Sequence, residues 1–122
     1  MLKALLDTNM LLAIAQFKAD VIGELRKHGY VPIILSCVKQ ELEKLALGRS
    51  KDAKAARVAL ELLEKHDFDY ITKGGPVDSA LLSVAKSEGW AVATNDAALI
   101  KKLKAQGIMA IRLRQKKMLV LE

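Results

Sequence analysis

Four carboxylates occupy positions from which one fold could direct them at a single site. Asp7 follows the apolar run at residues 2–6 and precedes a second apolar run. A charged side chain between two buried segments is costly unless something pairs with it. Asp96 comes just after the apolar segment WAVAT at residues 90–94. If residues 2–6 and 90–94 form neighbouring parallel strands, both carboxylates reach the same crevice beyond the strand ends.

Two further acids fall at the edges of predicted helical faces. On a helix over residues 37–47, Glu41 lies about 60° from the centre of the apolar face, whereas Glu43 lies more than about 120° away, towards solvent. On a helix over residues 76–87, Asp78 lies about 75° from the centre of the apolar face and in the first turn. Glu41 and Asp78 can therefore lean into a crevice, and Glu43 is expected to point away from it.

Three of the four acids also have an ordinary structural explanation. Asp78 and Asp96 stand in first turns, where capping and the helix dipole favour an acid. Glu41 could be a surface glutamate like many others. Asp7 is different, because a carboxylate at the end of a buried strand needs a partner. Taken together the four acids are harder to explain structurally, since each stands where the predicted topology points side chains at one crevice.

A cluster of four carboxylates predicts a hard divalent cation. Four such groups cannot all remain ionised in a small space unless cations neutralise them. The sequence offers no paired cysteines, and Cys37, the single cysteine, is expected to be a small buried filler. His28 and His66 fall at predicted helix ends, where the dipole explains them. Oxygen ligands without histidine or thiolate favour Mg²⁺ or Mn²⁺ over Zn²⁺.

The elements that must position these acids alternate between strand and helix. The apolar runs predict strands at 2–6, 30–35, 68–72, 90–94 and 108–113, with 118–122 as a further candidate. The 3.6-residue periodicity and the capping signals predict helices at 10–17, 21–28, 37–47, 52–65, 76–87 and 97–105. The alternation predicts a single domain over residues 1–122 with a three-layer α/β/α architecture and a central, mainly parallel sheet of four to five strands.

Local signals refine these boundaries. Thr8 or Asn9 is expected to cap the first helix, and Ser36 the helix that follows residues 30–35. Asn95 or Asp96 is expected to cap the helix at 97–105. Pro32 favours a strand end or an edge strand for residues 30–35, because proline donates no ladder hydrogen bond.

Composition limits the functional classes. Lys plus Arg outnumber Asp plus Glu by 20 to 14, a formal charge of +6 that favours polyanionic partners. Only five aromatic residues are present, which argues against a stacking platform for single-stranded bases. No segment is long and apolar enough for a membrane span, and no signal peptide opens the chain. With a single cysteine, a reducing cytoplasmic compartment is expected.

Four motifs carry a family resemblance over essentially the whole chain. They are LLDTNMLL at 5–12, CVKQELEKL at 37–45, VDSALLSVAK at 77–86 and VATNDAALIKKL at 92–103. Together they resemble the PIN domain family of small metal-dependent ribonucleases. The family's acidic positions then correspond to Asp7, Glu41, Asp78 and Asp96. Asn9 matches the first motif, and Thr94 matches the small hydroxyl residue before the last acid.

The resemblance implies phosphodiester hydrolysis of RNA, in an endonuclease that uses one or two Mg²⁺ or Mn²⁺ ions. Asp7 and Asp96 are then expected to be the central metal ligands, with Asp78 beside them. Glu41 would complete a second metal site or position the attacking water. Asn9 and Thr94 would support the site by hydrogen bonding. Such metals lower the pKa of water and offset charge on the leaving oxygen.

Basic residues are expected to guide the RNA, since phosphate contacts supply affinity without sequence information. Taken singly, most of these side chains are better explained as solvated surface charges, and the collective excess is the usable signal. Three groups of basic residues stand near the motifs: Lys101, Lys102 and Lys104 after the last acid; Arg112, Arg114, Lys116 and Lys117 after the fifth strand; and Lys39, Lys44, Arg49 and Lys51 around Glu41.

Two branches of the family remain open. The ending GIMAIRLRQKKMLVLE favours a housekeeping nuclease that processes ribosomal RNA precursors in a pre-ribosomal particle. The alternative is the toxin of a toxin–antitoxin pair, with an antitoxin as its partner. A homodimer is expected in either branch, because residues 10–17, 21–28 and 52–65 offer spare apolar surface.

Three functions other than that of an active nuclease fit the sequence less well. An RNA-binding PIN module without turnover would lack some of the four acids, and here all are present. A phosphoaspartyl hydrolase would need a second aspartate where Asn9 stands. A receiver domain would need an acid ahead of the first strand, and residues 1–6 hold none.

Overall fold

A mixed sheet with helices on both faces forms the domain. The computed structural model describes residues 2–17, 20–114 and 118–121. The strand order is β3-β2-β1-β4-β5-β6. Neighbouring strands are parallel from β3 to β5, and β6 is antiparallel to β5. The strands are β1 (Leu2–Leu6), β2 (Tyr30–Leu35), β3 (Asp69–Ile71), β4 (Ala91–Ala93), β5 (Ala110–Arg114) and β6 (Met118–Leu121).

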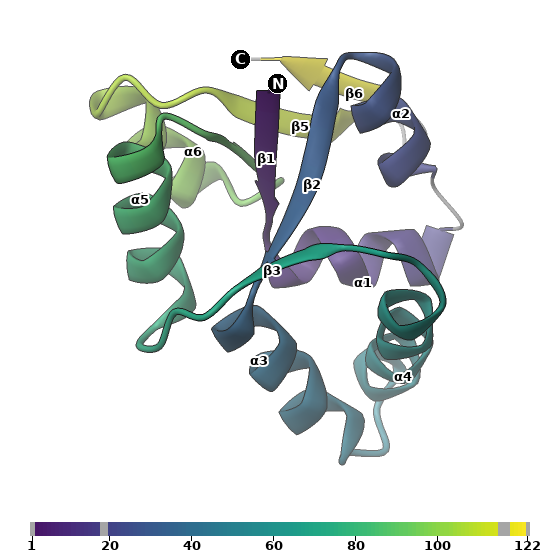
Figure 1. Ribbon diagram of the computed structural model, residues 1–122. Helices are drawn as coiled ribbons and strands as arrows, with labels where there is room; N and C mark the ends of the chain where they lie inside the picture. The colour runs from purple at the N-terminus through teal and green to yellow at the C-terminus, as the bar shows by residue number, and fades with distance from the viewer. Residues whose placement is uncertain (1, 18–19, 115–117, 122) are drawn as a thin grey trace.

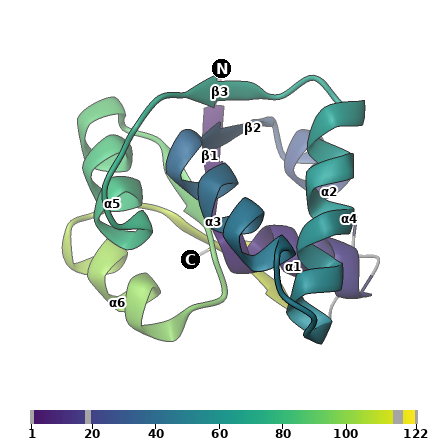
Figure 2. The same ribbon diagram turned by 90° about the horizontal axis from the view of Figure 1, so that it is seen from below.

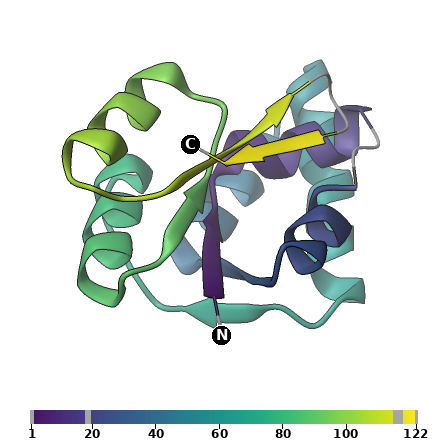
Figure 3. The same cartoon turned by 90° about the horizontal axis from the view of Figure 1, so that it is seen from above.

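Six helices connect and cover these strands in the described part of the chain. They are α1 (Thr8–Phe17), α2 (Val21–Lys27), α3 (Ser36–Ala46), α4 (Lys51–Lys65), α5 (Val77–Glu88) and α6 (Ala97–Ala105). Helices α5 and α6 lie on one side of the sheet, and α1, α2 and α4 lie on the other (Figures 1 and 3). The three-layer α/β/α architecture expected from the sequence is therefore confirmed, with a sheet that reaches six strands once β6 is counted.

The core lies on both faces of the central strands. Leu5, Leu6, Ile34 and Leu35 are fully buried in β1 and β2. Strands of a parallel sheet are covered by helices on both faces, so their sequences read as continuous apolar runs. This explains why β1 and β2 could be recognised from LKALL and YVPIIL without any alternation of polar residues. None of the helices in the described ranges combines the length and apolar character needed to cross a bilayer.

The first and fourth strands are direct neighbours. The register pairs Leu6 of β1 with Ala93 of β4. One residue further on, the backbone N–H of Asp7 donates to the carbonyl of Ala93 at 3.1 Å. The condition on which the convergence of Asp7 and Asp96 depended is therefore met, because both follow neighbouring strands at their carboxyl ends.

Ser36 does not cap α3 as the sequence suggested. The helix already includes Ser36, and Leu35 occupies the cap position with no side-chain capping bond. The Ser36 hydroxyl instead accepts a hydrogen bond from Lys73 N at 2.9 Å and donates one to Lys73 O at 3.2 Å. This pair of bonds fastens the start of α3 to the loop between β3 and α5, which leads to Asp78.

Pro32 lies in an interior strand, because β2 is flanked by both β1 and β3. The edge-strand prediction for residues 30–35 is therefore wrong. The register explains how proline is tolerated there. Pro32 pairs with Ala4 on the β1 side, whereas pairing with β3 begins only at Ile33. At Pro32 the strand has a partner on one side only, which is the local situation that proline requires.

Candidate active site

Asp7 and Thr94 form the buried centre of the site. The Thr94 hydroxyl donates a hydrogen bond to Oδ2 of Asp7 at 2.8 Å. Thr94 is completely buried, and Asp7 is 5% exposed. Backbone bonds from Asp7 N to Ala93 O and from Thr94 N to Ile111 O hold both residues at the end of the sheet. The sheet itself therefore fixes the position of the carboxylate.

The protonation of Asp7 reflects its surroundings. Burial raises the pKa of the Asp7 carboxyl above its ordinary value, and repulsion from Asp78 and Asp96 raises this pKa further. The hydrogen bonds from Thr94 and from the backbone of Thr8 act in the opposite direction and are outweighed. Asp78 and Asp96 therefore both act on Asp7, where negative charge is unfavourable without a counter-ion.

Asp96 has a structural role in addition to its place in the site. It is the N-cap of α6, and its Oδ1 accepts hydrogen bonds from Ala98 N at 2.9 Å and Leu99 N at 3.1 Å. Its own backbone N–H donates to the Thr94 hydroxyl at 3.1 Å. Thr94 thus contacts both Asp7 and Asp96. Since the capping bonds use Oδ1, Oδ2 of Asp96 makes no hydrogen bond within the described residues and can serve another ligand.

Asp78 is exposed on the second residue of α5. This helix follows Pro76 at the cap position and has no side-chain capping bond. The capping explanation considered for Asp78 therefore does not apply. Its negative charge is near enough to Asp7 to raise the pKa of the Asp7 carboxyl.

Glu41 lines a groove between α3 and the start of α5. The groove has a volume of about 670 Å³, and its walls include Glu41, Glu43 and residues 75–77, which immediately precede Asp78. The prediction that Glu43 points away from the crevice is therefore wrong. Both Glu41 and Glu43 are exposed, and both line this groove.

Electrostatics still distinguish the two glutamates. Burial raises the pKa of the Cys37 thiol, and the charge of Glu41 raises it further. Cys37 is buried, as expected of a small filler residue. Glu41 stands four residues later on the same helix, so the two side chains lie on the same side of α3.

Thr8, which the sequence suggested only as a cap for the first helix, adds a buried hydroxyl next to Asp7. It is the first residue of α1, and its buried Oγ1 has no hydrogen-bond partner among the described residues. A buried hydroxyl without a partner indicates a missing water, ion or ligand. Asn9, the next residue, is exposed on α1. The only available signal for Thr8 is its position directly after Asp7 in the motif DTN.

The chemistry of the site fits a divalent cation, although the ligand set is not enclosed. Within the described ranges, no three His, Cys, Asp or Glu side chains come close enough together to hold one ion. Asp7, Asp78 and Asp96 have no salt bridge to a basic side chain in the same ranges. Hard carboxylate oxygens, an orphaned hydroxyl and uncompensated negative charge are the features that Mg²⁺ or Mn²⁺ would complete.

The basic residues expected to guide RNA differ in their exposure to solvent. Lys101 and Lys102 are exposed on α6, Arg114 is exposed at the end of β5, and Arg112 is partly buried. Lys116 and Lys117 lie outside the described residues. The β4–α6 loop that leads to α6 is fixed by Asn95, whose Oδ1 accepts a hydrogen bond from Leu113 N at 2.8 Å.

Comparison with known proteins places this geometry in a family. The family model described as a PIN-like domain matches residues 4–116. Ribonuclease VapC9 from Archaeoglobus fulgidus is 38% identical over 121 residues, covering 98% of this chain and 88% of that protein. Ribonuclease VapC4 from Methanocaldococcus jannaschii is 34% identical over 125 residues, covering 96% of this chain and 94% of that protein.

Solved structures agree with the sequence matches. The structure of the PIN domain endonuclease Utp24 superposes with a TM-score of 0.81 at 26% identity, covering 98% of this chain and 90% of that one. VapBC2 from Rickettsia felis, solved bound to a DNA fragment from their promoter, gives a TM-score of 0.69 at 16% identity, covering 93% and 100%. The second likeness concerns the fold alone. The resemblance drawn from the four motifs is thus confirmed: the chain belongs to the PIN-like domain family.

Proposed function

We propose that this chain is a metal-dependent ribonuclease that cuts RNA internally at the carboxyl end of its parallel sheet. Ribonuclease activity is the function that the family match and both VapC relatives support. The observation that carries the proposal is the buried Asp7 carboxylate at the β1–β4 junction, within electrostatic range of Asp78 and Asp96. An endonucleolytic cut is favoured by the similarity to the endonuclease Utp24.

The proposed roles follow from what each side chain contacts. Asp7, Asp78 and Asp96 would hold Mg²⁺ or Mn²⁺, which supplies Lewis-acid stabilisation of the scissile phosphate and lowers the pKa of water. Thr94 holds the Asp7 carboxylate in one orientation and receives the backbone N–H of Asp96. Glu41 would position the attacking water or a second ion from across the groove. Asn9 would contact the substrate or a water from the first turn of α1.

Two biological settings remain. The basic C-terminal segment favours processing of ribosomal RNA precursors by an endonuclease. Similarity to VapC9 and VapC4 favours a toxin-type ribonuclease held by an antitoxin. Both settings are compatible with a cytoplasmic protein and with a homodimer. Light scattering at micromolar concentration tests the dimer, and the mass of a single chain would contradict it.

The activity is tested with internally labelled RNA, with Mn²⁺ or Mg²⁺ and with a chelator. We expect metal-dependent cleavage by the wild-type chain and loss of cleavage by at least 100-fold in Asp7→Asn, since one metal ligand is removed while the side-chain shape is kept. Circularised RNA, which has no ends, distinguishes an internal cut from trimming. Equal cleavage by the wild-type chain and Asp7→Asn would exclude the proposed mechanism.

A further inference from the structure

Positive charge is concentrated at the turn between α3 and α4. We define the hairpin tip as residues 44–57, the end of α3, the turn and the first half of α4. This segment contains one acid, Asp52, and five basic residues, Lys44, Arg49, Lys51, Lys54 and Arg57. Its net formal charge is +4. A second basic segment, residues 101–117, has seven basic residues and no acid, so the tip carries one part of the excess that favours a polyanionic partner.

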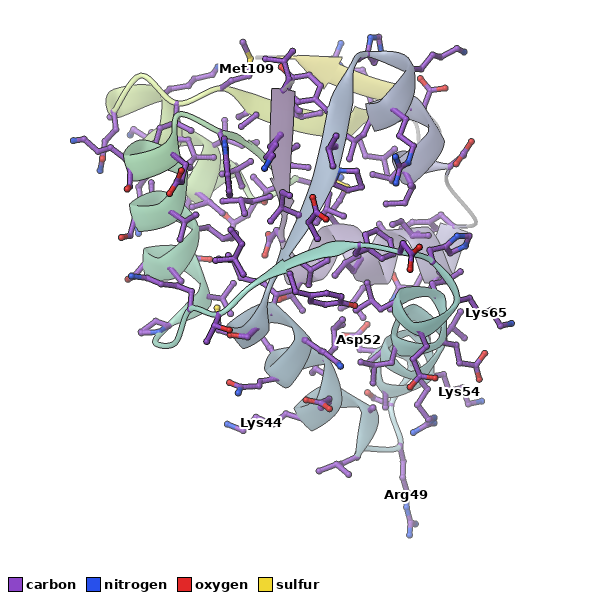
Figure 4. All side chains as sticks on the ribbon, in the orientation of Figure 1. Lys44, Arg49, Asp52, Lys54, Lys65 and Met109 are labelled. Atoms are coloured by element: carbon purple, nitrogen blue, oxygen red, sulfur yellow. The ribbon has the colours of Figure 1, made fainter. Side chains whose placement is uncertain are left out.

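The tip projects away from the sheet on the side of the candidate active site. In Figures 1 and 2, α3 begins where β2 ends and extends with α4 past the carboxyl ends of the strands. Lys44, Arg49 and Lys54 point outward from α3, the turn and α4 (Figure 4). All three are exposed, and none forms an ion pair within the described residues. They are available to an anionic partner.

Internal hydrogen bonds brace the turn. The Arg57 guanidinium donates through Nη1 to Ala46 O at 2.6 Å and to Gly48 O at 3.3 Å. Ser50 caps α4 by accepting a hydrogen bond from Ala53 N at 3.2 Å. The remaining cations are thus displayed on an ordered support, which lowers the entropic cost of binding.

A groove runs from the tip towards the start of α5. Lys44 and Leu47 line it together with Glu41 and residues 75–77, which immediately precede Asp78. Leu47, the residue after α3, is 87% exposed and offers apolar surface beside Lys44. An RNA strand lying in this groove would meet apolar surface and positive charge at the tip, and carboxylates near Asp78.

We propose that the hairpin tip binds phosphates of the RNA substrate several nucleotides away from the scissile bond, with Leu47 against an adjacent base. The inference rests on the proposed ribonuclease function. RNA is favoured over an acidic protein surface because the groove next to the tip also carries Glu41, which the proposed function assigns to the cleavage of a phosphate chain. The tip supplies affinity and register, and the acids supply the chemistry.

The geometry sets the length of RNA that can use the tip. Helix α3 has 11 residues and therefore spans about 16 Å from the sheet edge to the turn. An RNA with only two nucleotides on each side of the scissile phosphate is too short to reach from the acids to the tip. A 20-nucleotide RNA can occupy both. The contribution of the tip must then depend on substrate length.

The test compares two double variants with equal change of charge. Arg49→Glu with Lys51→Glu reverses two charges of the tip and brings its net formal charge from +4 to zero. Lys65→Glu with Lys86→Glu reverses two exposed lysines at the far ends of α4 and α5. Each pair is combined with Asp7→Asn to prevent cleavage, and binding of a fluorescent 20-nucleotide RNA is followed by anisotropy at several salt concentrations. Thermal melting checks that each variant is folded.

We expect the tip variant to weaken binding by at least tenfold and to lower the salt slope by about 1 to 2, while the control changes binding by less than threefold. With Asp7 restored, kcat/KM on the 20-nucleotide RNA should fall with the tip variant, and kcat/KM on the short RNA should not. Equal weakening by the two variants, or equal loss on both RNA lengths, would overturn the inference. Absence of metal-dependent cleavage in the wild-type chain would instead refute the proposed function. The binding comparison would still test whether the hairpin tip binds RNA.

Discussion

The hydroxyl of Thr94 lies 2.8 Å from Oδ2 of Asp7, in a buried hydrogen bond between residues 87 positions apart in the chain. The Thr94 hydroxyl oxygen also accepts a hydrogen bond from the backbone N–H of Asp96 at 3.1 Å. Thr94, in the loop between β4 and α6, therefore holds the Asp7 side chain and the Asp96 backbone in a fixed position relative to each other. The candidate site depends on this bridge between strands that are adjacent in space only.

Two replacements of Thr94 should separate the effect of its side-chain volume from the effect of its hydrogen bond to Asp7. Thr94→Val keeps the volume but leaves the buried Asp7 carboxylate without its donor, which should lower stability by about 1–3 kcal/mol. RNA cleavage should fall by at least tenfold. Thr94→Ser keeps the hydroxyl and should retain most of the activity. Thermal melting and single-turnover cleavage measure the two effects, and equal activity of the Val and Ser variants would contradict the bridging role.

Removing the Asp7 charge should abolish the stabilisation of the protein by metal. In the metal-free protein, Asp7→Asn should melt at a higher temperature than the wild type, because an unfavourable buried charge near Asp78 and Asp96 is lost. Mn²⁺ at 100 times its Kd should stabilise the wild type by about 2.7 kcal/mol. The same concentration should leave Asp7→Asn almost unchanged. Calorimetry with and without chelator provides the comparison, and equal Mn²⁺ stabilisation of both proteins would remove Asp7 from the ligand set.

The two roles of Asp96 can be separated. Asp96→Asn keeps a side-chain oxygen that can cap α6 and removes the charge, so it should melt close to the wild type while cleavage is lost. Asp96→Ala loses both the cap and the charge, and should be less stable by about 1 kcal/mol. Circular dichroism melts and cleavage assays decide the matter. If Asp96→Asn cleaves like the wild type, Asp96 is a cap and nothing more.

Glu41 and Glu43 form a natural matched pair on α3, since both line the same groove. Glu41→Gln should lower metal-dependent cleavage by at least tenfold, because the proposed function assigns Glu41 to the attacking water or a second ion. Glu43→Gln makes the same chemical change and should leave cleavage within twofold of the wild type. Rates at saturating Mn²⁺ are the proper measurement. Similar losses in the two variants would assign the effect to the overall charge of the groove.

Much of the fold could be predicted from local sequence. Each strand segment is a short apolar run, and each helix shows a polar and an apolar face with a recognisable end. The Asp20 cap of α2 and the Ser50 cap of α4 both use side chains suited to that role. These features depend on residues close together in the chain. The four acids could likewise be selected, because strand ends and first turns have known directions in an α/β fold.

The errors arose where distant segments decide. Ser36 has the type of a helix cap, yet its hydroxyl bonds to Lys73, 37 residues away. Pro32 has the type of an edge residue, yet it lies in an interior strand whose other neighbour begins one position later. A residue's type states which hydrogen bonds it can form, and only packing determines which partner is within reach.

The sequence by itself determined the alternation of strands and helices, the set of candidate acids and the membership of the PIN-like family, because these are written in local pattern and motif. The tertiary structure alone decided that β1 and β4 are neighbours, that Thr94 bonds to Asp7, and that Asp78 and Asp96 add their repulsion at the same carboxylate. It also decided that Glu41 shares its groove with Glu43. The reason is physical: strand order and side-chain proximity follow from burying apolar surfaces of remote segments together, and that free energy belongs to the assembled chain.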